Sequence, residues 1–209
     1  MRFKCSPLEG HVQLVTAVAF SSEGTNICSA SADGTCRVWR IDDATCYFVL
    51  EGDKRVASCN FSADGKMIIT GDWGYTTRVW DAVFGQPVMS LAGHQGKLTA
   101  SRFRPDGNFM ITASEDKHVR TWDPRRGVSV AYQAPDEMLD CAFHPDTVSI
   151  IGACKNGMLL VWDIRKPDET RLEIEAHGTD WVTCCALSAS GDKALTSRYC
   201  PARIMNLSH

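Results

Sequence analysis

A serine, a histidine and an aspartate near the start of the chain are the residue types that nucleophilic catalysis uses. Ser29 and Asp33 are four residues apart, and His11 precedes both. In a catalytic triad the histidine takes the serine proton while the aspartate orients the imidazole ring. A nucleophilic serine also needs a strained, exposed turn and an oxyanion hole, and the sequence contains no Gly-x-Ser-x-Gly turn. The alternative is that the three side chains hold a fold together.

The spacing of these residues recurs further along the chain. His94, Thr112 and Asp116 repeat the pattern, with a threonine hydroxyl in place of the serine hydroxyl. A tryptophan follows the histidine by 28 residues in both places. A catalytic triad occurs once, in a cleft, whereas this set occurs twice at equal spacing. We therefore interpret the set as structural, and we expect a protein that is not an enzyme.

A period near forty residues runs through the chain. It is marked by Trp39, Trp80, Trp122 and Trp162, with Met205 in the fifth place. Each period contains an alternating apolar run, a turn rich in Asp and Gly, two further runs separated by a tight turn, and a weaker fourth run. Period-two alternation is typical of strands, and a repeat of this length is typical of stacked supersecondary units. The sequence therefore predicts an all-β protein built from four-stranded units.

The five units begin at a Gly-His pair or its remnant. We expect one domain over residues 1–209, with units at approximately 8–51, 52–92, 93–134, 135–175 and 176–209. Four short antiparallel strands that end in Trp-Asp resemble the WD40 repeat, and the resemblance covers residues 8–207. It implies a β-propeller of WD40 type, in which each unit is a blade around a central channel.

The resemblance also implies a role for the recurring polar residues. In WD40 repeats a histidine, a serine or threonine, an aspartate and a tryptophan form a hydrogen-bonded network within one blade. The matching residues are His11, Ser29, Asp33 and Trp39 in the first unit, and His94, Thr112, Asp116 and Trp122 in the third. Buried donors and acceptors must be paired, so these residues are expected to stabilise their blades.

The other three units depart from this pattern. The second has Gly52-Asp53 in place of Gly-His and the sequence Asp-Trp-Gly-Tyr in its tight turn. The fourth lacks the histidine and has Asn156 in place of the aspartate, and the fifth has His177 but a different turn. We expect these three blades to be held more by packing than by polar networks.

Partners of the family often bind the face that carries the first-strand entrances and the turns between the second and third strands. Trp73 and Tyr75 occupy such a turn, and Trp181 precedes a first strand. Exposed aromatic side chains anchor protein interfaces, although either tryptophan could instead fold over its own blade. Arg55 and Lys97 complete the candidate set for partner binding. Other positions on this face are Leu14, Ala32, Glu115, Glu137, Lys155 and Arg198.

Two further motifs leave a second function open. The third and fourth units contain Trp-Asp-Pro-Arg and Trp-Asp-Ile-Arg, which resemble the motif of WD40 substrate receptors in cullin-4 ubiquitin ligases. The candidate adaptor-binding residues are Asp123, Arg125, Asp163 and Arg165. An arginine at this place can also pair with a nearby aspartate or cover its own strand. The sequence therefore favours a protein-binding scaffold and leaves a ligase receptor as the alternative.

Composition narrows the remaining possibilities. The formal net charge is −3, and 44% of the 209 residues are hydrophobic, which is enough to build a core. No basic stripe indicates nucleic acid, no apolar run is long enough to span a membrane, and no phosphate loop or metal-ligand cluster appears. We expect other proteins as partners, no cofactor, no metal and no small-molecule substrate.

The cysteines and the N-terminus bear on location. The chain has ten cysteines without a Cys-x-x-Cys pair, and the start of the chain lacks the apolar core of a signal peptide. We expect reduced, buried thiols and a cytoplasmic or nuclear protein that is not secreted. The cysteines in apolar runs are Cys28, Cys36, Cys59, Cys141, Cys154, Cys184 and Cys185.

Five units are few, because propellers of this family usually close with seven blades. The fifth unit stops after its third strand, and Arg2–Ser6 could supply its outer strand and close a five-blade ring. The alternative is an open arc whose first and fifth blades expose apolar sides. The degraded turn of the fifth unit favours the arc.

Overall fold

The computed structural model describes residues 7–178, 180–197 and 202–207 of the chain. Across these ranges the chain forms nineteen strands in five antiparallel sheets, and no helix is assigned to any of the described residues. Strands neighbouring in sequence pair within each sheet, in the order first to last from the inside outward. The prediction of an all-β protein with repeated four-stranded units is confirmed.

Each sheet is built from consecutive strands. The first contains β1 (Val15–Phe20), β2 (Asn26–Ser31), β3 (Thr35–Arg40) and β4 (Cys46–Glu51). The second contains β5 (Val56–Phe61), β6 (Met67–Asp72), β7 (Thr77–Asp81) and β8 (Pro87–Leu91). The third contains β9 (Leu98–Phe103), β10 (Met110–Ser114), β11 (His118–Asp123) and β12 (Val128–Gln133). The fourth contains β13 (Met138–Phe143), β14 (Ser149–Cys154), β15 (Met158–Asp163) and β16 (Thr170–Glu175). The fifth contains β17 (Cys184–Leu187), β18 (Lys193–Ser197) and β19 (Arg203–Asn206).

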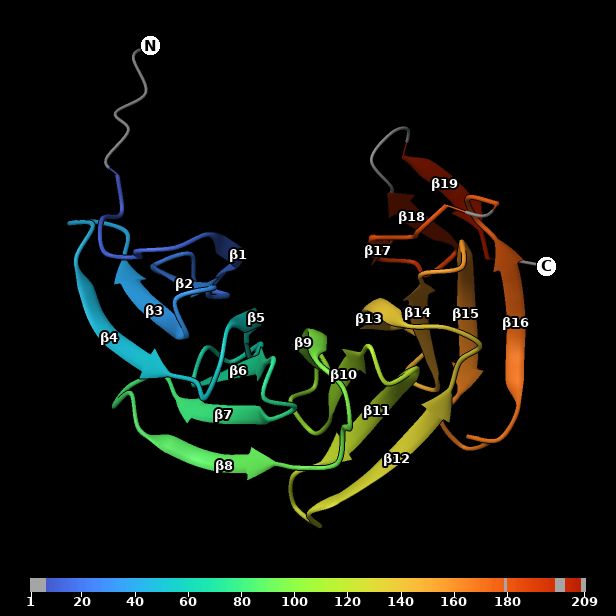
Figure 1. The fold of residues 1–209 in the computed structure, drawn as a ribbon, viewed down its shortest axis with the longest axis horizontal. Helices are drawn as coiled ribbons and strands as arrows, with labels where there is room; N and C mark the ends of the chain where they lie inside the picture. Colours follow the sequence, from blue (N-terminus) through green and yellow to red (C-terminus); the bar gives the residue numbers. More distant parts are fainter. Residues whose placement is uncertain (1–6, 179, 198–201, 208–209) are drawn as a thin grey trace.

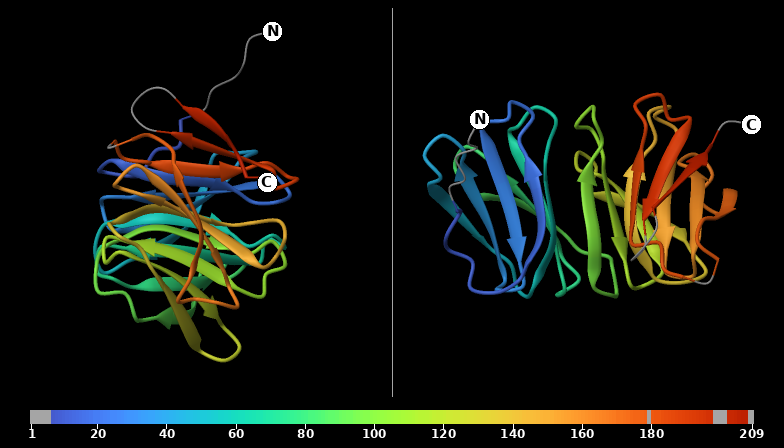
Figure 2. Two further views of the ribbon diagram at one scale, coloured as in Figure 1. Left: turned by 90° about the vertical axis from the view of Figure 1, so that its right-hand side faces the viewer. Right: turned by 90° about the horizontal axis from the view of Figure 1, so that it is seen from above.

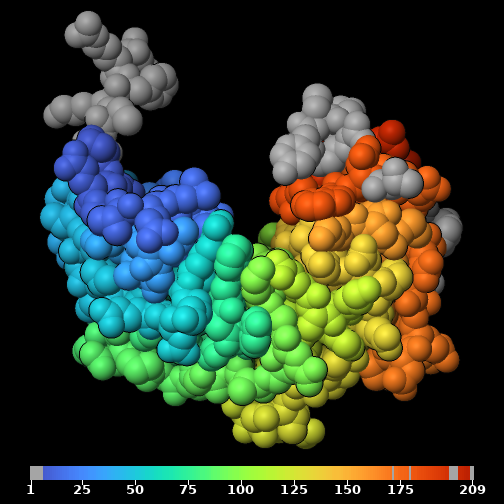
Figure 3. All heavy atoms as spheres, in the orientation of Figure 1, coloured from blue at the N-terminus to red at the C-terminus, as the bar shows by residue number. Residues whose placement is uncertain are grey.

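The sheets stand side by side around an arc that does not close (Figures 1 and 3). The first strand of each sheet lies nearest the centre, and β4, β8, β12 and β16 lie on the outer rim (Figure 1). Seen from the side, the strands run between two ends where the turns gather (Figure 2). The fold is therefore an open propeller, as the degraded fifth unit suggested. The proposed closing segment, Arg2–Ser6, lies outside the described residues.

The turns between the first two strands follow from their sequences. Gly24, Gly65 and Gly107 have φ values of 68°, 70° and 73°, in the left-handed region that glycine adopts without steric cost. In the second sheet the Asp64 carboxylate accepts a hydrogen bond from the Lys66 backbone N–H at 3.1 Å. In the second and third sheets an aspartate followed by a glycine thus fixes the strand reversal, and in the first sheet Gly24 follows a glutamate, so that the alternating apolar residues on either side pair in register.

Neighbouring sheets are joined by packing and by hydrogen bonds. The Thr16 hydroxyl donates to the Val56 carbonyl at 2.6 Å, and the Thr99 hydroxyl donates to the Met138 carbonyl at 2.8 Å. Between the third and fourth sheets, Arg102 donates to both oxygens of the buried Asp140 carboxylate at 2.9 Å. These contacts connect the first strands of successive blades, close to the centre of the arc.

The cysteines support most of the expectation made from the sequence. All eight cysteines among the described residues are free thiols. Those that are buried are Cys28, Cys36, Cys59, Cys141, Cys154 and Cys185. The expectation is wrong for Cys184, which is exposed. Ser58 holds the same place in the second sheet, where it is buried against Ser101 of the third sheet at 2.7 Å. Cys184 has no following blade among the described residues to cover it.

The two ends of the arc expose side chains that are buried elsewhere. Phe20, the last residue of β1, is 66% exposed, whereas Phe61 at the same place in β5 is 6% exposed. Leu195 in β18 is 47% exposed, whereas Ile69 at the same place in β6 is fully buried. The difference arises because Phe61 packs against the first blade and Ile69 against the third, while each end of the arc lacks one such neighbour.

Candidate functional site

The three residues that resemble a triad lie together in the first blade. The His11 Nδ1 atom is 2.8 Å from the Asp33 carboxylate, and the Nε2 atom is 2.7 Å from the Ser29 hydroxyl oxygen. The Trp39 indole N–H donates to the same hydroxyl at 2.8 Å. With the Nδ1 proton donated to Asp33, the Ser29 hydroxyl donates to Nε2 and accepts from the indole. This arrangement uses every polar group of the set within the blade.

The Asp33 carboxylate is the most heavily hydrogen-bonded group of this network. It accepts from the Thr35 hydroxyl at 2.6 Å, from the Thr35 N–H at 2.9 Å and from the Val12 N–H at 3.2 Å. Burial works to raise the pKa of Asp33, but the hydrogen bonds from Thr35 and His11 outweigh burial and hold it well below its ordinary value. The aspartate is therefore ionised and anchors the turn between β2 and β3.

The third blade repeats the same geometry. The His94 Nδ1 atom is 2.7 Å from the Asp116 carboxylate, and the Nε2 atom is 2.7 Å from the Thr112 hydroxyl oxygen. The Trp122 indole N–H donates to that hydroxyl at 2.8 Å. Burial opposes ionisation of Asp116, but hydrogen bonds from His94 and from backbone N–H groups lower its pKa to about 2. Burial of His94 lowers its pKa despite the neighbouring carboxylate, so the imidazole is neutral at pH 7.

Neither hydroxyl is placed for nucleophilic attack. Ser29 and Thr112 are buried, and each lies in a second strand between a histidine and a tryptophan of its own blade. A serine that attacks substrate must instead face a cleft with an oxyanion hole beside it. The geometry of the two sets is that of a scaffold, in which fixed polar contacts connect three parts of one blade.

The second blade contains a polar network of a different composition. The Arg78 guanidinium pairs with the buried Asp72 carboxylate and with Asp53, and the Trp80 indole donates to the Thr70 hydroxyl at 2.9 Å. The expectation that packing dominates this blade stays a prediction, but the blade also holds a polar network that the histidine pattern did not indicate. Asp53 stands where the first, third and fifth units have a histidine, so an arginine between two acids replaces the histidine network. In the sequence, this network could have been predicted from Asp53 at the histidine position together with Asp72 and Arg78 in the same unit.

The fourth and fifth blades retain less of the pattern. In the fifth, the His177 Nε2 atom is 3.1 Å from the Thr196 hydroxyl oxygen. In the fourth, the Asn156 side chain accepts from the Met158 N–H at 3.2 Å, which keeps the turn but does not reach a histidine. Among the described residues, the full set of histidine, hydroxyl, aspartate and tryptophan thus meets in the first and third blades.

The candidate partner-binding face is assembled by one repeated backbone contact. In four blades the first residue after the second strand donates its N–H to the carbonyl of the first-strand entrance, at 2.9 Å in each case. The four pairs are Ala32 with Leu14, Trp73 with Arg55, Glu115 with Lys97, and Lys155 with Glu137. Eight of the positions assigned to this face by sequence therefore come together in four pairs. Tyr75 and Trp181 are in none of these pairs, and Arg198 lies outside the described residues.

Trp73 brings three of the candidate residues into one cluster. The Arg55 guanidinium carbon is 4.5 Å from the centre of the Trp73 ring system, and the Lys97 ammonium nitrogen is 4.4 Å from it. Trp73 remains 36% exposed, and Tyr75 beside it in the same turn is exposed as well. We refer to Arg55, Trp73 and Lys97 as the Trp73 cluster. Cation–π contacts of this kind contribute about 0.5–2 kcal/mol each.

Trp181 lies at the entrance to the fifth sheet. It is 47% exposed, and the Lys155 ammonium nitrogen is 4.7 Å from the centre of its ring. Lys155 also donates to Glu137 at 2.8 Å, and this hydrogen bond raises the pKa of Lys155. Trp181 thus adds a second exposed tryptophan to this face, in contact with a lysine from the preceding blade, whereas Trp73 contacts a lysine from the following one.

Comparison with known proteins agrees with the architecture. The family model described as "WD domain, G-beta repeat" matches residues 3–40, 44–81 and 85–123, which is more than half of the chain. The chain belongs to the WD40-repeat family. The resemblance drawn from the Trp-Asp periodicity is confirmed, and the three matched segments each end one residue after a repeat tryptophan, at Trp39, Trp80 and Trp122.

Relatives of this WD40 protein are longer chains. The nuclear distribution protein nudF of Aspergillus niger is 26% identical over 201 residues, a region that covers 85% of this chain and 45% of the relative. The guanine nucleotide-binding protein subunit beta of Nicotiana tabacum is 27% identical over 210 residues, covering 92% of this chain and 56% of the relative. The periodic tryptophan protein 2 homolog of Schizosaccharomyces pombe is 33% identical over 96 residues, covering 45% of this chain and 11% of the relative. The chain therefore spans about half the length, or less, of these relatives.

The two Trp-Asp-x-Arg motifs of this WD40 protein make local contacts. Arg165 forms two hydrogen bonds to the Asp163 carboxylate, at 2.9 and 2.5 Å. Arg125 donates its backbone N–H to Asp123 at 3.0 Å and its guanidinium to Asn108. Both arginines are exposed. Each motif thus closes a turn after the third strand, in addition to any role in binding.

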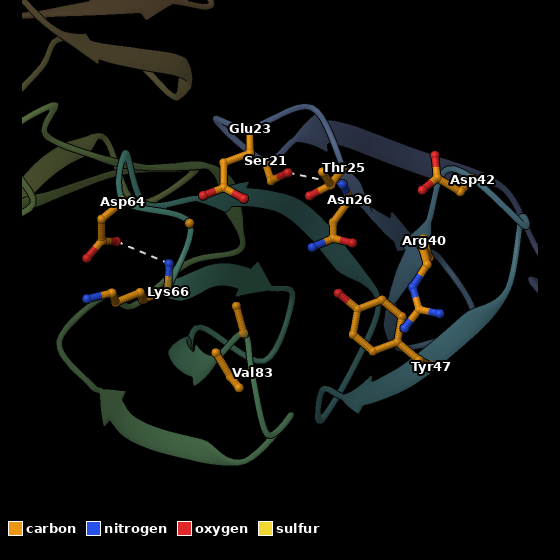
Figure 4. A pocket seen from close by; sticks show the side chains of 12 residues that line it. Ser21, Glu23, Thr25, Asn26, Arg40, Asp42, Tyr47, Asp64, Lys66 and Val83 are labelled. Atoms are coloured by element: carbon orange, nitrogen blue, oxygen red, sulfur yellow. Dashed lines mark hydrogen bonds between the residues drawn. The ribbon is translucent and has the colours of Figure 1, made fainter.

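A hollow of about 560 Å³ lies at the opposite end of the strands, between the first two blades. Figure 4 shows both acidic and basic side chains around it, among them Glu23, Asp64, Lys66 and Arg40. Arg40 pairs with Asp43, and Asp64 accepts hydrogen bonds within its own turn. Because these charges are mixed and are partly engaged in turns, the hollow presents no convergent set of groups for chemistry.

Within residues 7–178, 180–197 and 202–207, no group of three or more His, Cys, Asp or Glu side chains is arranged to hold a metal ion. No helix long and apolar enough to cross a membrane occurs in that part of the chain.

Proposed function

We propose that this WD40 protein is a non-enzymatic scaffold that binds other proteins through the face carrying the Trp73 cluster, Tyr75 and Trp181. The observation that carries the proposal is the partly exposed Trp73 between Arg55 and Lys97. Tryptophan and arginine are the residue types most enriched at the centres of protein interfaces. The polar groups of the triad-like sets support this reading, since they are used within their blades.

The names of two relatives support a role inside a protein complex. One is named as a subunit of a guanine nucleotide-binding protein, and another as the ribosome biogenesis protein WDR12 homolog of Drosophila sechellia. By analogy we propose that this chain works inside a multi-protein complex, in the cytoplasm or the nucleus, and that its five units act as one domain. Nucleic acid, membranes, cofactors and small-molecule substrates have no part in this proposal.

Replacement of Trp73 tests the proposal. Trp73→Ala should reduce affinity for a partner captured from cells by more than about 2 kcal/mol, because it removes an interface anchor and frees the two cations. The matched control is Phe84→Ala, which removes an exposed aromatic side chain from the β7–β8 turn at the other end of the same blade. Affinity purification with quantitative mass spectrometry measures both. Unchanged partner recovery by a folded Trp73→Ala variant would contradict the proposal.

The alternative function is a substrate receptor of a cullin-4 ubiquitin ligase. It is supported by exposed arginines at the same position of two adjacent blades, Arg125 and Arg165. Under this alternative, replacing both arginines with glutamate should abolish co-purification with the cullin-4 adaptor, while Trp73→Ala should leave it intact. Failure of the unmodified chain to recover the adaptor would reject the alternative and leave the scaffold proposal in place.

A further inference from the structure

The paired positions on the candidate face differ in how their charges are balanced. In the third blade Lys97 lies 3.4 Å from Glu115, and in the fourth Lys155 lies 2.8 Å from Glu137. In the second blade the turn position is occupied by Trp73, so Arg55 meets an aromatic ring where Lys97 of the third blade meets the acid Glu115. Among the described residues, no carboxylate lies within ion-pairing distance of the Arg55 guanidinium.

Trp73 holds the Arg55 guanidinium in place. The Arg55 guanidinium carbon and the Lys97 ammonium nitrogen lie over the same indole, 4.5 and 4.4 Å from its centre. A guanidinium stacked in this way has lost much of its rotational freedom before a ligand arrives, which lowers the entropic cost of forming a bidentate ion pair.

The surroundings limit what the cluster can bind. Glu51, Asp53 and Glu115 lie around it, so a ligand with closely spaced negative charges would be repelled. Leu14 and Tyr75 are exposed apolar side chains on the same face. The site therefore favours one carboxylate next to an apolar group, and it disfavours the phosphate backbone of a nucleic acid.

Tyr75 occupies a turn position that adopts the left-handed conformation in the first four blades. Its φ is 69°, and Gly34, Lys117 and Gly157 at the same place have φ values of 89°, 68° and 90°. The turn itself therefore sets this backbone conformation, and in the second blade it carries an exposed tyrosine two residues after Trp73.

We infer that the Trp73 cluster binds a segment of a partner protein that presents a single aspartate or glutamate beside an apolar residue. The partner's carboxylate accepts hydrogen bonds from Arg55, and its apolar neighbour packs on Tyr75 or Leu14. This inference rests on the proposed function, since it names the chemistry of the partner that the face recognises. Trp73 acts as a positioning residue that fixes the guanidinium.

A displayed library of random peptides, selected on the immobilised chain, tests the inference. The enriched peptides should share an isolated Asp or Glu next to an aliphatic or aromatic residue. Replacement of that acid by its amide should weaken binding at least tenfold, as should Arg55→Gln in the protein. Arg55→Glu should bind the corresponding lysine peptide better than the acidic one. Arg40→Gln, at the opposite end of the strands, should leave affinity unchanged.

The outcomes separate the inference from the proposed function. Peptides that need Trp73 but bind Arg55→Gln normally would overturn the carboxylate inference and support the scaffold. Failure to enrich any peptide that needs this face would count against both. Tighter, Arg55-dependent binding of single-stranded RNA than of any peptide would overturn the inference in favour of a polyanion. Melting curves of each variant establish that it is folded.

Discussion

The first and second blades place similar residues in opposite surroundings. Phe20 and Phe61 end the first strand of their sheets, yet the first is largely exposed and the second is buried against the first blade. Their polar networks differ as well, with a histidine–serine–tryptophan set bonded to Asp33 in the first blade and an arginine paired with two aspartates in the second. Burial in this fold is therefore set by whether a preceding blade is present, and the internal network of a blade varies independently of that packing.

The largest expected effect comes from the buried phenylalanine. Phe61→Ala should lower the free energy of unfolding by about 3–5 kcal/mol, because it leaves a cavity between the first two blades. Phe20→Ala should change it by no more than about 0.5 kcal/mol, because the side chain already faces solvent. Urea titration of both variants measures the difference. Equal losses would show that something covers Phe20 in solution.

The ion-paired network of the second blade gives the next effect. Arg78→Met should cost about 3 kcal/mol, because Asp72 would be left buried without its cation. Asp53→Asn is the matched control, since Asp53 is exposed and its loss leaves the inner pair intact. The control should cost less than about 1 kcal/mol. If both variants unfold at the same urea concentration, the inner pair does not stabilise the blade.

The histidine–aspartate networks of the first and third blades should give the smallest effect on the free energy of unfolding, and this effect depends on pH. Asp33→Ala and Asp116→Ala should each cost about 1–3 kcal/mol at pH 7, because buried donors lose their acceptor. Both carboxyls have a pKa below the ordinary value in the folded chain, so their contribution is complete above pH 3.8 and is lost as the pH falls toward the folded pKa. For Asp116 the loss should centre between pH 3.8 and about 2.

Thermal melts from pH 7 down to the acid range measure this dependence. The gap in melting temperature between each variant and the unmodified chain should narrow at low pH. A constant gap would mean that the carboxylate charge contributes nothing, and that packing of the aspartate explains the loss.

Much of the fold was readable from sequence because its signals are local. Alternating apolar residues specify the strands, and turns that contain Asp or Gly specify where each strand reverses. The recurrence of histidine, hydroxyl and tryptophan at equal spacing predicted which side chains would meet in the first and third blades. Phe20 and Phe61 sit in near-identical local patterns, so no local signal could show that only one of them would be covered.

The Trp73 cluster and the arginine network were harder to predict. Trp73 is 18 residues from Arg55 and 24 residues from Lys97 in the sequence, and the three residues come from two blades. Their contact therefore depends on how neighbouring sheets are rotated against each other. Asp72 directly precedes Trp73. The sequence analysis singled out the tryptophan as unusual, but it is the aspartate that forms the buried ion pair with Arg78. Contacts between units carry no periodic signal.

Asp140 gives the two ends of the arc different resistance to fraying. Its carboxylate accepts from Arg102 in the third blade and from the Cys185 N–H in the fifth, while belonging to the fourth. Opening of the fifth blade would remove the Cys185 N–H donor from the buried Asp140 carboxylate, which costs free energy. The backbone amides of β17 should therefore exchange with solvent more slowly than is usual for a strand at the open end of a sheet array. The first blade meets its neighbour through neutral contacts such as that from Thr16 to Val56, and its strands should open first.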